Sequence, residues 1–324
     1  MPSAVTTGFD AAFDWLTQAP RAAHGVAAAR IILGIVVWTQ LVDNWSDRSY
    51  TWGDGSHWTS PVELRGEWPG FLGVFNVVNG GWFDLVYVAA IVFGFLLMIG
   101  AYTRAAAVMT LFLWVSLYVS NPFVGSGGDA VLRVVLLYLC FTDSGRHWSV
   151  DAWLRRRRGE VRRWFPQWFS TTLHNLAIIL MIHQVVMVYV ASALWKVQSE
   201  AWMNGTATYF PLQTEAYSPW RDVLGPIITA EPVIVGATWS AIAMQLFFPV
   251  LLLYRPTRAL ALVSIAGMHL GIGLLMGIMY FSLSMIAVDM LLISERSWQT
   301  GTDWLRNWWE KRRRGSVTQE ASYR

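Results

Sequence analysis

Long apolar runs, almost free of charged residues, alternate with short polar loops along most of the chain. A helix needs about 20 apolar residues to cross the roughly 30 Å of hydrocarbon in a bilayer. The runs therefore predict an all-α integral membrane protein with about eight transmembrane helices. The predicted crossings are Gly25–Val42, Trp82–Ala101, Ala105–Ser120, Asp129–Phe141, Leu173–Lys196, Val233–Tyr254, Ala259–Met276 and Ile278–Ile293.

The composition supports this class. Hydrophobic residues make up 55% of the chain and charged residues 14%, against roughly 25% charged in a typical soluble domain. The chain has 20 tryptophans, a residue that is enriched where a bilayer meets water. The single cysteine, Cys140, excludes an internal disulfide and any metal site built from several cysteines.

Charged residues are distributed unevenly between the loops, and this predicts the orientation. Seven arginines lie between residues 146 and 163, and Lys311–Arg314 follow the last apolar run. Acidic residues predominate instead in the loops 43–81 and 197–231. Because basic loops stay in the cytoplasm, both termini are predicted to be cytoplasmic, as an even number of crossings requires.

The chain divides into two predicted regions. Residues 1–294 form a transmembrane helical domain. Residues 295–324 mix tryptophans with basic residues, which is typical of an amphipathic helix at the membrane interface followed by a basic cytoplasmic tail. The lipid bilayer is the expected partner of these basic segments, and no nucleic acid partner is predicted.

Ionisable side chains inside a membrane cost several kcal/mol unless they are paired or hydrated, so each one is a candidate functional residue. In the predicted topology Lys196 and Asp129 lie at the extracytoplasmic ends of their helices, and His269 lies just past the middle of its helix. These three side chains are predicted to meet in a pocket that opens outward. A structural alternative exists for each: Lys196 can be an anchor that reaches the interface, and His269, like His183, can bond a neighbouring helix.

Three further groups at membrane depth have structural alternatives of the same kind. Asp129 and Arg133 are four residues apart on one helical face, where they can neutralise each other. Arg30 has five donors that can tie backbone carbonyls of several helices together. Asp289, close to the cytoplasmic end of the last crossing, is predicted to be interfacial.

Familiar catalytic motifs are missing from the sequence. It has no P-loop, no dinucleotide-binding glycine motif, no HExxH and no serine nucleophile elbow. The six histidines lack the spacing of metal ligands, so no metal is predicted.

Four segments, in the same order along the chain, resemble those of a known family. FTDSGRHWSVDAW (Phe141–Trp153) is similar to a signature that follows the fourth helix of vitamin K-dependent γ-glutamyl carboxylases and of the wider bacterial HTTM family. ARIILG (Ala29–Gly34) resembles their R-x-x-x-G in the first helix. ALWKVQSEAWMNG (Ala193–Gly205) and GMHLGIGLLMGIMYFS (Gly267–Ser282) resemble the segments that carry their lysine and a histidine.

This resemblance implies a role for each matching residue. It makes Lys196 the general base that deprotonates vitamin K hydroquinone, and it makes His269 a catalytic residue that positions the substrate. A desolvated lysine is suited to act as a base. The side chains expected to bind substrate or cofactor are Arg30, Asp129, Arg133, His183, Tyr189 and Trp202. The implied cofactor is reduced vitamin K or menaquinone, without a metal, and the implied location is a bacterial plasma membrane.

The sequence also departs from the carboxylases. Their fourth helix begins with an Asn-His pair, where this chain has Gly127, Gly128 and Asp129. Their large luminal domain has no counterpart here, so a quinone-using, carboxylase-like enzyme of the wider family, with a small secreted peptide as one candidate substrate, is the expected function. The alternative is a non-catalytic scaffold, or a maturation or export partner for a secreted peptide. A transporter is less favoured because no inverted repeat or pair of broken helices is visible.

Overall fold

The computed structural model describes residues 4–53, 69–159 and 165–322, and regular structure within these ranges is entirely helical. Among the described residues, six helices are long and apolar enough to span a membrane, so the class of all-α integral membrane protein is confirmed. These six are α2 (Ala23–Asp43), α6 (Gly80–Ile99), α7 (Thr103–Ser120), α10 (Gln167–Lys196), α14 (Glu231–Leu251) and α15 (Arg255–Leu275).

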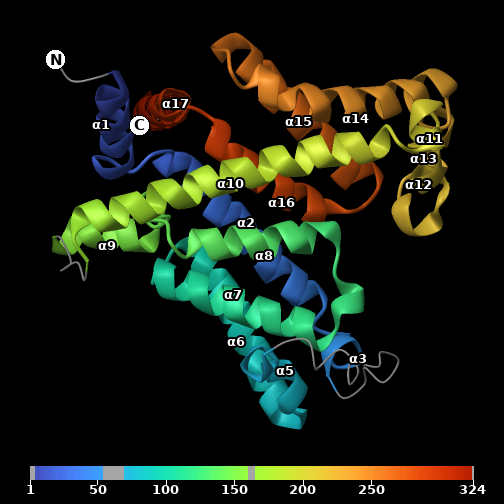
Figure 1. The fold of residues 1–324 in the computed structure, drawn as a ribbon. Helices are drawn as coiled ribbons and strands as arrows, with labels where there is room; N and C mark the ends of the chain where they lie inside the picture. The colour runs from blue at the N-terminus through green and yellow to red at the C-terminus, as the bar shows by residue number, and fades with distance from the viewer. Residues whose placement is uncertain (1–3, 54–68, 160–164, 323–324) are drawn as a thin grey trace.

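The other two predicted crossings correspond to shorter helices. Helix α8 (Gly127–Leu139) has 13 residues and α16 (Met279–Asp289) has 11. At 1.5 Å per residue these helices rise only about 20 and 16 Å, less than the hydrocarbon thickness of about 30 Å. Both pack inside the bundle against α2 (Figure 1). The count of eight crossings and the cytoplasmic location of the termini therefore stay predictions.

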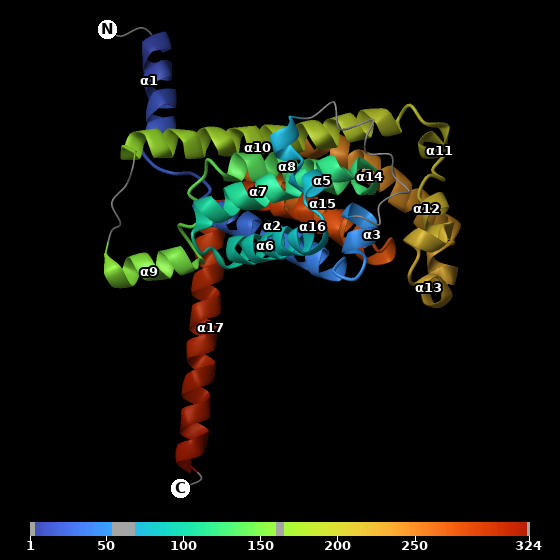
Figure 2. The same cartoon turned by 90° about the horizontal axis from the view of Figure 1, so that it is seen from below.

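Shorter helices cluster at the two ends of the bundle (Figures 1 and 2). One end carries α1 (Ala4–Thr17), α9 (Val150–Arg158) and α17 (Glu295–Ser322). The opposite end carries α3 (Arg48–Trp52), α5 (Val74–Val77), α11 (Glu200–Met203), α12 (Tyr209–Gln213) and α13 (Arg221–Ile228). Helix α9 ends in four consecutive arginines, so the first end is basic.

The tail helix α17 leaves the bundle and runs across the direction of the long helices (Figure 2). A helix lying in the plane of a membrane surface would have this orientation relative to the spans. The predicted orientation depends on the uneven distribution of charge between loops, and some of these charged residues lie outside the described residues. They are Asp54, Glu63, Arg65, Glu67, Arg162 and Arg163.

Arg30 and Gly34 fasten α2 to the end of α6. The Arg30 side chain is fully buried, and its Nη1 donates to the carbonyls of Leu97 and Met98 at 2.6 and 2.7 Å. A Cβ on Gly34 would lie 2.5 Å from Met98 Cα, so only glycine permits this close approach of the two helices. Both residues of the R-x-x-x-G segment therefore act on the same helix end.

The segment 141–153 links α8 to α9 at the basic end of the bundle. Ser144 and Trp148 offer their carbonyls to Arg30 Nε and Nη2 at 3.2 and 2.7 Å. Asp151 accepts hydrogen bonds from the backbone N–H groups of Tyr102 and Thr103 at 2.9 and 2.8 Å, at the start of α7. The segment thus orders the connection between α8 and α9 and caps a third helix.

Candidate functional site

One face of α10 carries a column of polar side chains. Tyr189, Ser192 and Lys196 are spaced at i, i+3 and i+7, so they lie on one side of the helix over about 10 Å. The column faces α14, α15 and α16 rather than lipid, because its partners are Gln245, His269 and Asp289. It occupies the extracytoplasmic half of α10 in the predicted topology.

Lys196 is the last residue of α10 and tops the column. Its Nζ donates to Ser192 Oγ at 2.7 Å and to Gln245 Oε1 on α14. It also lies 5.0 Å from the centre of the Trp202 ring, within range of a cation–π contact. The amine therefore turns toward the bundle, whereas an interface anchor would extend into water.

Below Lys196, three buried side chains form a hydrogen-bonded triad. The Tyr189 hydroxyl donates to Asp289 Oδ2 at 2.8 Å and lies 3.1 Å from His269 Nε2. All three side chains are at most 1% exposed. Because the only hydroxyl hydrogen goes to Asp289, His269 Nε2 must be the donor, and its Nδ1 keeps a lone pair.

The buried position of Asp289 corrects the prediction that it is interfacial. Helix α16 is short and packs against α2, α8, α10 and α15, so its last residue ends inside the protein. Asp289 Oδ1, His269 Nδ1 and Ser282 Oγ are buried without a hydrogen-bond partner among the described residues. Buried polar atoms are rarely left unpaired, so three of them around one group indicate a place for a ligand, a proton or water.

Asp129 and Arg133 belong to a second, separate polar group. Asp129 forms a capping box with Ser126 at the start of α8, and the described residues contain no ion pair between Asp129 and Arg133. The Arg133 guanidinium instead lies 3.4 Å from the centre of the Tyr118 ring. Their mutual neutralisation is therefore absent from the structure.

A small cavity of about 30 Å³ adjoins this second group. Its lining includes Gln40, Trp114, Tyr118, Asp129 and Arg133. A cavity of this size holds one or two water molecules. Arg133 Nη1 and Gln40 Oε1 are buried without a partner in the described part of the chain, so such waters would satisfy them.

Phe281 lies between the two groups and divides the pocket that the sequence predicted. Its ring packs edge-on against His269 with centroids 5.7 Å apart, while a Cβ on Gly128 would come within 2.7 Å of Phe281 Cα. Lys196 and His269 thus share one polar group, and Asp129 is in the other.

The remaining candidates divide between this site and other parts of the bundle. His183 is on an exposed face of α10. Arg30 uses its donors on four backbone carbonyls at the basic end, which is the structural alternative considered for it. Tyr189 and Trp202 contact His269 and Lys196, respectively. The sequence did not single out Ser192, and it gave no role to Gln245; a glutamine within an apolar run was the available signal.

The HTTM domain family matches residues 18–298, which include all the spans and both polar groups. The chain belongs to the HTTM family. A curated relative is the uncharacterized protein YitO of Bacillus subtilis (strain 168), which is 26% identical over 257 residues. That alignment covers 76% of this chain and 78% of YitO. No solved structure matches the HTTM protein.

Proposed function

We propose that this HTTM protein is a membrane enzyme that deprotonates a reduced quinone, with Lys196 as the general base. The observation that carries the proposal is the environment of Lys196 Nζ. Its two hydrogen-bond partners, Ser192 Oγ and Gln245 Oε1, are uncharged, and the described residues contain no carboxylate paired with it. A neutral amine has two N–H groups for two acceptors, and its lone pair is left to take a proton.

The surroundings of Lys196 fit a lipophilic quinol of the vitamin K or menaquinone type. Leu194 and Trp195 are 49% and 73% exposed on the outer surface of α10, so an apolar ring can approach from the bilayer. Trp202 offers a flat face beside the amine. The buried Nδ1 of His269 can accept a second hydroxyl.

The chemistry divides between ligand and protein. A bound quinol supplies an acidic hydroxyl and two electrons for the reduction of oxygen. Lys196 Nζ takes the hydroxyl proton, so an O–H bond breaks as an N–H bond forms. Ser192 and Gln245 hold the amine in place.

Family membership supports the same class of reaction. The HTTM domain is linked to the membrane domains of vitamin K-dependent carboxylases. In the proposed arrangement both termini are cytoplasmic, the site faces outward in a bacterial plasma membrane, and a small secreted peptide is the candidate second substrate.

The decisive experiment measures quinol-dependent oxygen consumption by the protein in lipid nanodiscs. General bases contribute about 10²–10⁴-fold, so Lys196→Ala and Lys196→Arg should each lower the rate at least about 100-fold. Arginine keeps the charge but cannot act as a base at neutral pH. The chain has one other lysine, Lys311 in the tail, and Lys311→Ala serves as the matched control that retains the rate. Wild-type rates in both Lys196 variants would refute the proposal.

The second candidate function is a scaffold or maturation partner without catalysis. It is favoured by the small size of the cavity at Arg133 and by the bonds that the triad makes within the protein. Mass spectrometry of lipids that co-purify with the protein separates the two. Bound menaquinone that is lost in Lys196→Ala supports the enzyme, whereas absence of quinone in both forms supports the scaffold.

A further inference from the structure

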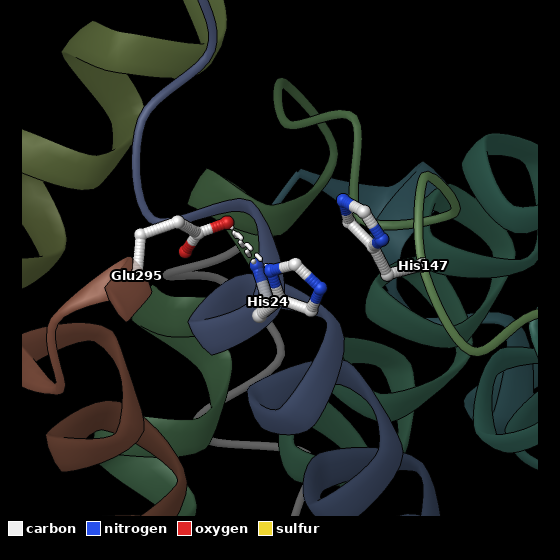
Figure 3. A group of neighbouring side chains, drawn as sticks. All are labelled: His24, His147 and Glu295. Carbon is white, nitrogen blue, oxygen red and sulfur yellow. Dashed lines mark hydrogen bonds and ion pairs between the residues drawn. The ribbon is translucent and has the colours of Figure 1, made fainter. Parts of the chain in front are cut away.

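Three potential metal ligands meet at the basic end of the bundle (Figure 3). They are His24 near the start of α2, His147 in the connection between α8 and α9, and Glu295 as the first residue of α17. One ligand atom from each lies within 4.8 Å of the others. The three residues are far apart in the sequence, so no spacing motif could reveal the cluster.

The members of the cluster contact one another and two neighbouring indoles. His24 Nδ1 lies 2.6 Å from Glu295 Oε1, and the rings of His24 and His147 stack with centroids 3.8 Å apart. The Trp148 ring packs edge-on against both His24 and Trp298 on α17.

We propose that His24, His147 and Glu295 bind a divalent transition-metal ion such as Zn²⁺. Two imidazoles and one carboxylate form a common protein ligand set for such ions, with bonds of about 2.0–2.2 Å. Ligand atoms around a tetrahedral ion are then about 3.4 Å apart, so atoms already within 4.8 Å are near the required spacing. The stacked imidazoles of His24 and His147 would turn so that a nitrogen of each points at the ion. A fourth position stays open for water.

An ion pair between His24 and Glu295 does not explain the whole group. Glu295 Oε2 is buried without a hydrogen-bond partner among the described residues, and an ion would give it one. His147 has no hydrogen bond from its ring in the described part of the chain, although it stacks directly on His24.

The position of the site suggests what the ion does. Glu295 and Trp298 lie one turn apart at the start of α17, and both contact the bundle through this group. The ion would therefore clamp the tail helix to α2 and to the connection before α9. Occupancy of the site would govern how firmly α17 stays docked.

The test is titration of the full-length protein with Co²⁺, followed by absorption spectroscopy, and with Zn²⁺, followed by calorimetry, using an affinity tag without histidine. We expect one equivalent bound and at least about a tenfold loss of affinity in His147→Gln and in Glu295→Gln. His183→Gln is the matched control, because His183 is an exposed histidine outside the cluster. Thermal unfolding of each apo variant establishes that it is folded.

The outcomes decide the proposal. Binding that is lost in both cluster variants and kept in the His183 variant supports it. Absence of saturable binding, or equal binding in all variants, overturns it. A thermal midpoint that rises with Zn²⁺ in the wild type but not in Glu295→Gln would in addition support the clamp, because ligands that bind the folded state stabilise it.

Discussion

Removing the hydroxyl of Tyr189 tests whether the buried triad is a coupled unit. Tyr189→Phe deletes the donor to Asp289 Oδ2 and the acceptor for His269 Nε2, and both partners are fully buried. Interhelical hydrogen bonds in membranes are worth about 0.6–2 kcal/mol each, and an orphaned buried polar group costs about 1–3 kcal/mol. The free energy of unfolding should therefore fall by about 2–3 kcal/mol, measured by steric trapping in bicelles.

Tyr87→Phe is the matched control for this measurement. Tyr87 is also fully buried, but its hydroxyl makes a single bond, 2.9 Å long, to the carbonyl of Leu41. Its loss should cost about 1 kcal/mol. A double-mutant cycle of Tyr189→Phe with Asp289→Asn should give a coupling energy of about 1 kcal/mol. Equal small losses in the two tyrosine variants, with no coupling to Asp289, would refute the reasoning.

Three further predictions concern the frame around the site. Arg30→Met removes the guanidinium donor from four carbonyls, of which that of Leu97 keeps the Gly100 N–H. It should cost about 3 kcal/mol of unfolding free energy in the same assay, and a loss below about 1 kcal/mol would contradict the clamp. Gly100 has φ +69°, and a Cβ there would lie 2.7 Å from Arg30 Nη1. Gly100→Ala should therefore lower the free energy of unfolding by about 2 kcal/mol. A thermal midpoint equal to that of the wild type would contradict this expectation. In a Cys140→Ser background, Asn204→Cys should react with an impermeant thiol reagent in whole cells and Ser297→Cys only after lysis; the reverse pattern would invert the topology.

The sequence predicted the class of fold because charge-free runs of sufficient length leave few alternatives to transmembrane helices. It predicted the two short helices, α8 and α16, less well, since hydropathy reports that a segment is apolar but not whether lipid or protein surrounds it. Asp289 illustrates the difficulty. A carboxylate near the end of an apolar run can reach water if the helix end is exposed, and only the packing of α16 against four neighbours removes that possibility.

Pairing across helices was the least predictable part of the site. Depth in the membrane suggested that Lys196 and His269 share one region. The structure gives Lys196 the partner Gln245 and links His269 to Asp289 through Tyr189. Depth alone cannot say which way a helix face points, however, so Asp129 was assigned to the same pocket. In the structure, Phe281 lies between His269 and the start of α8, where Asp129 is.

The four segments that carry the family resemblance have two different physical roles. Arg30, Gly34 and the segment 141–153 fasten helices to one another at the basic end, through carbonyl contacts and caps. Any protein with this bundle would need such fastenings, whether or not it is an enzyme, so these segments report the fold. Lys196 and His269, by contrast, are not needed to close a helix end. Under the proposed function, these two segments are the ones that distinguish catalysis from scaffolding. A family member that lacks both residues but keeps the other two segments should then retain the bundle without the proposed quinol chemistry.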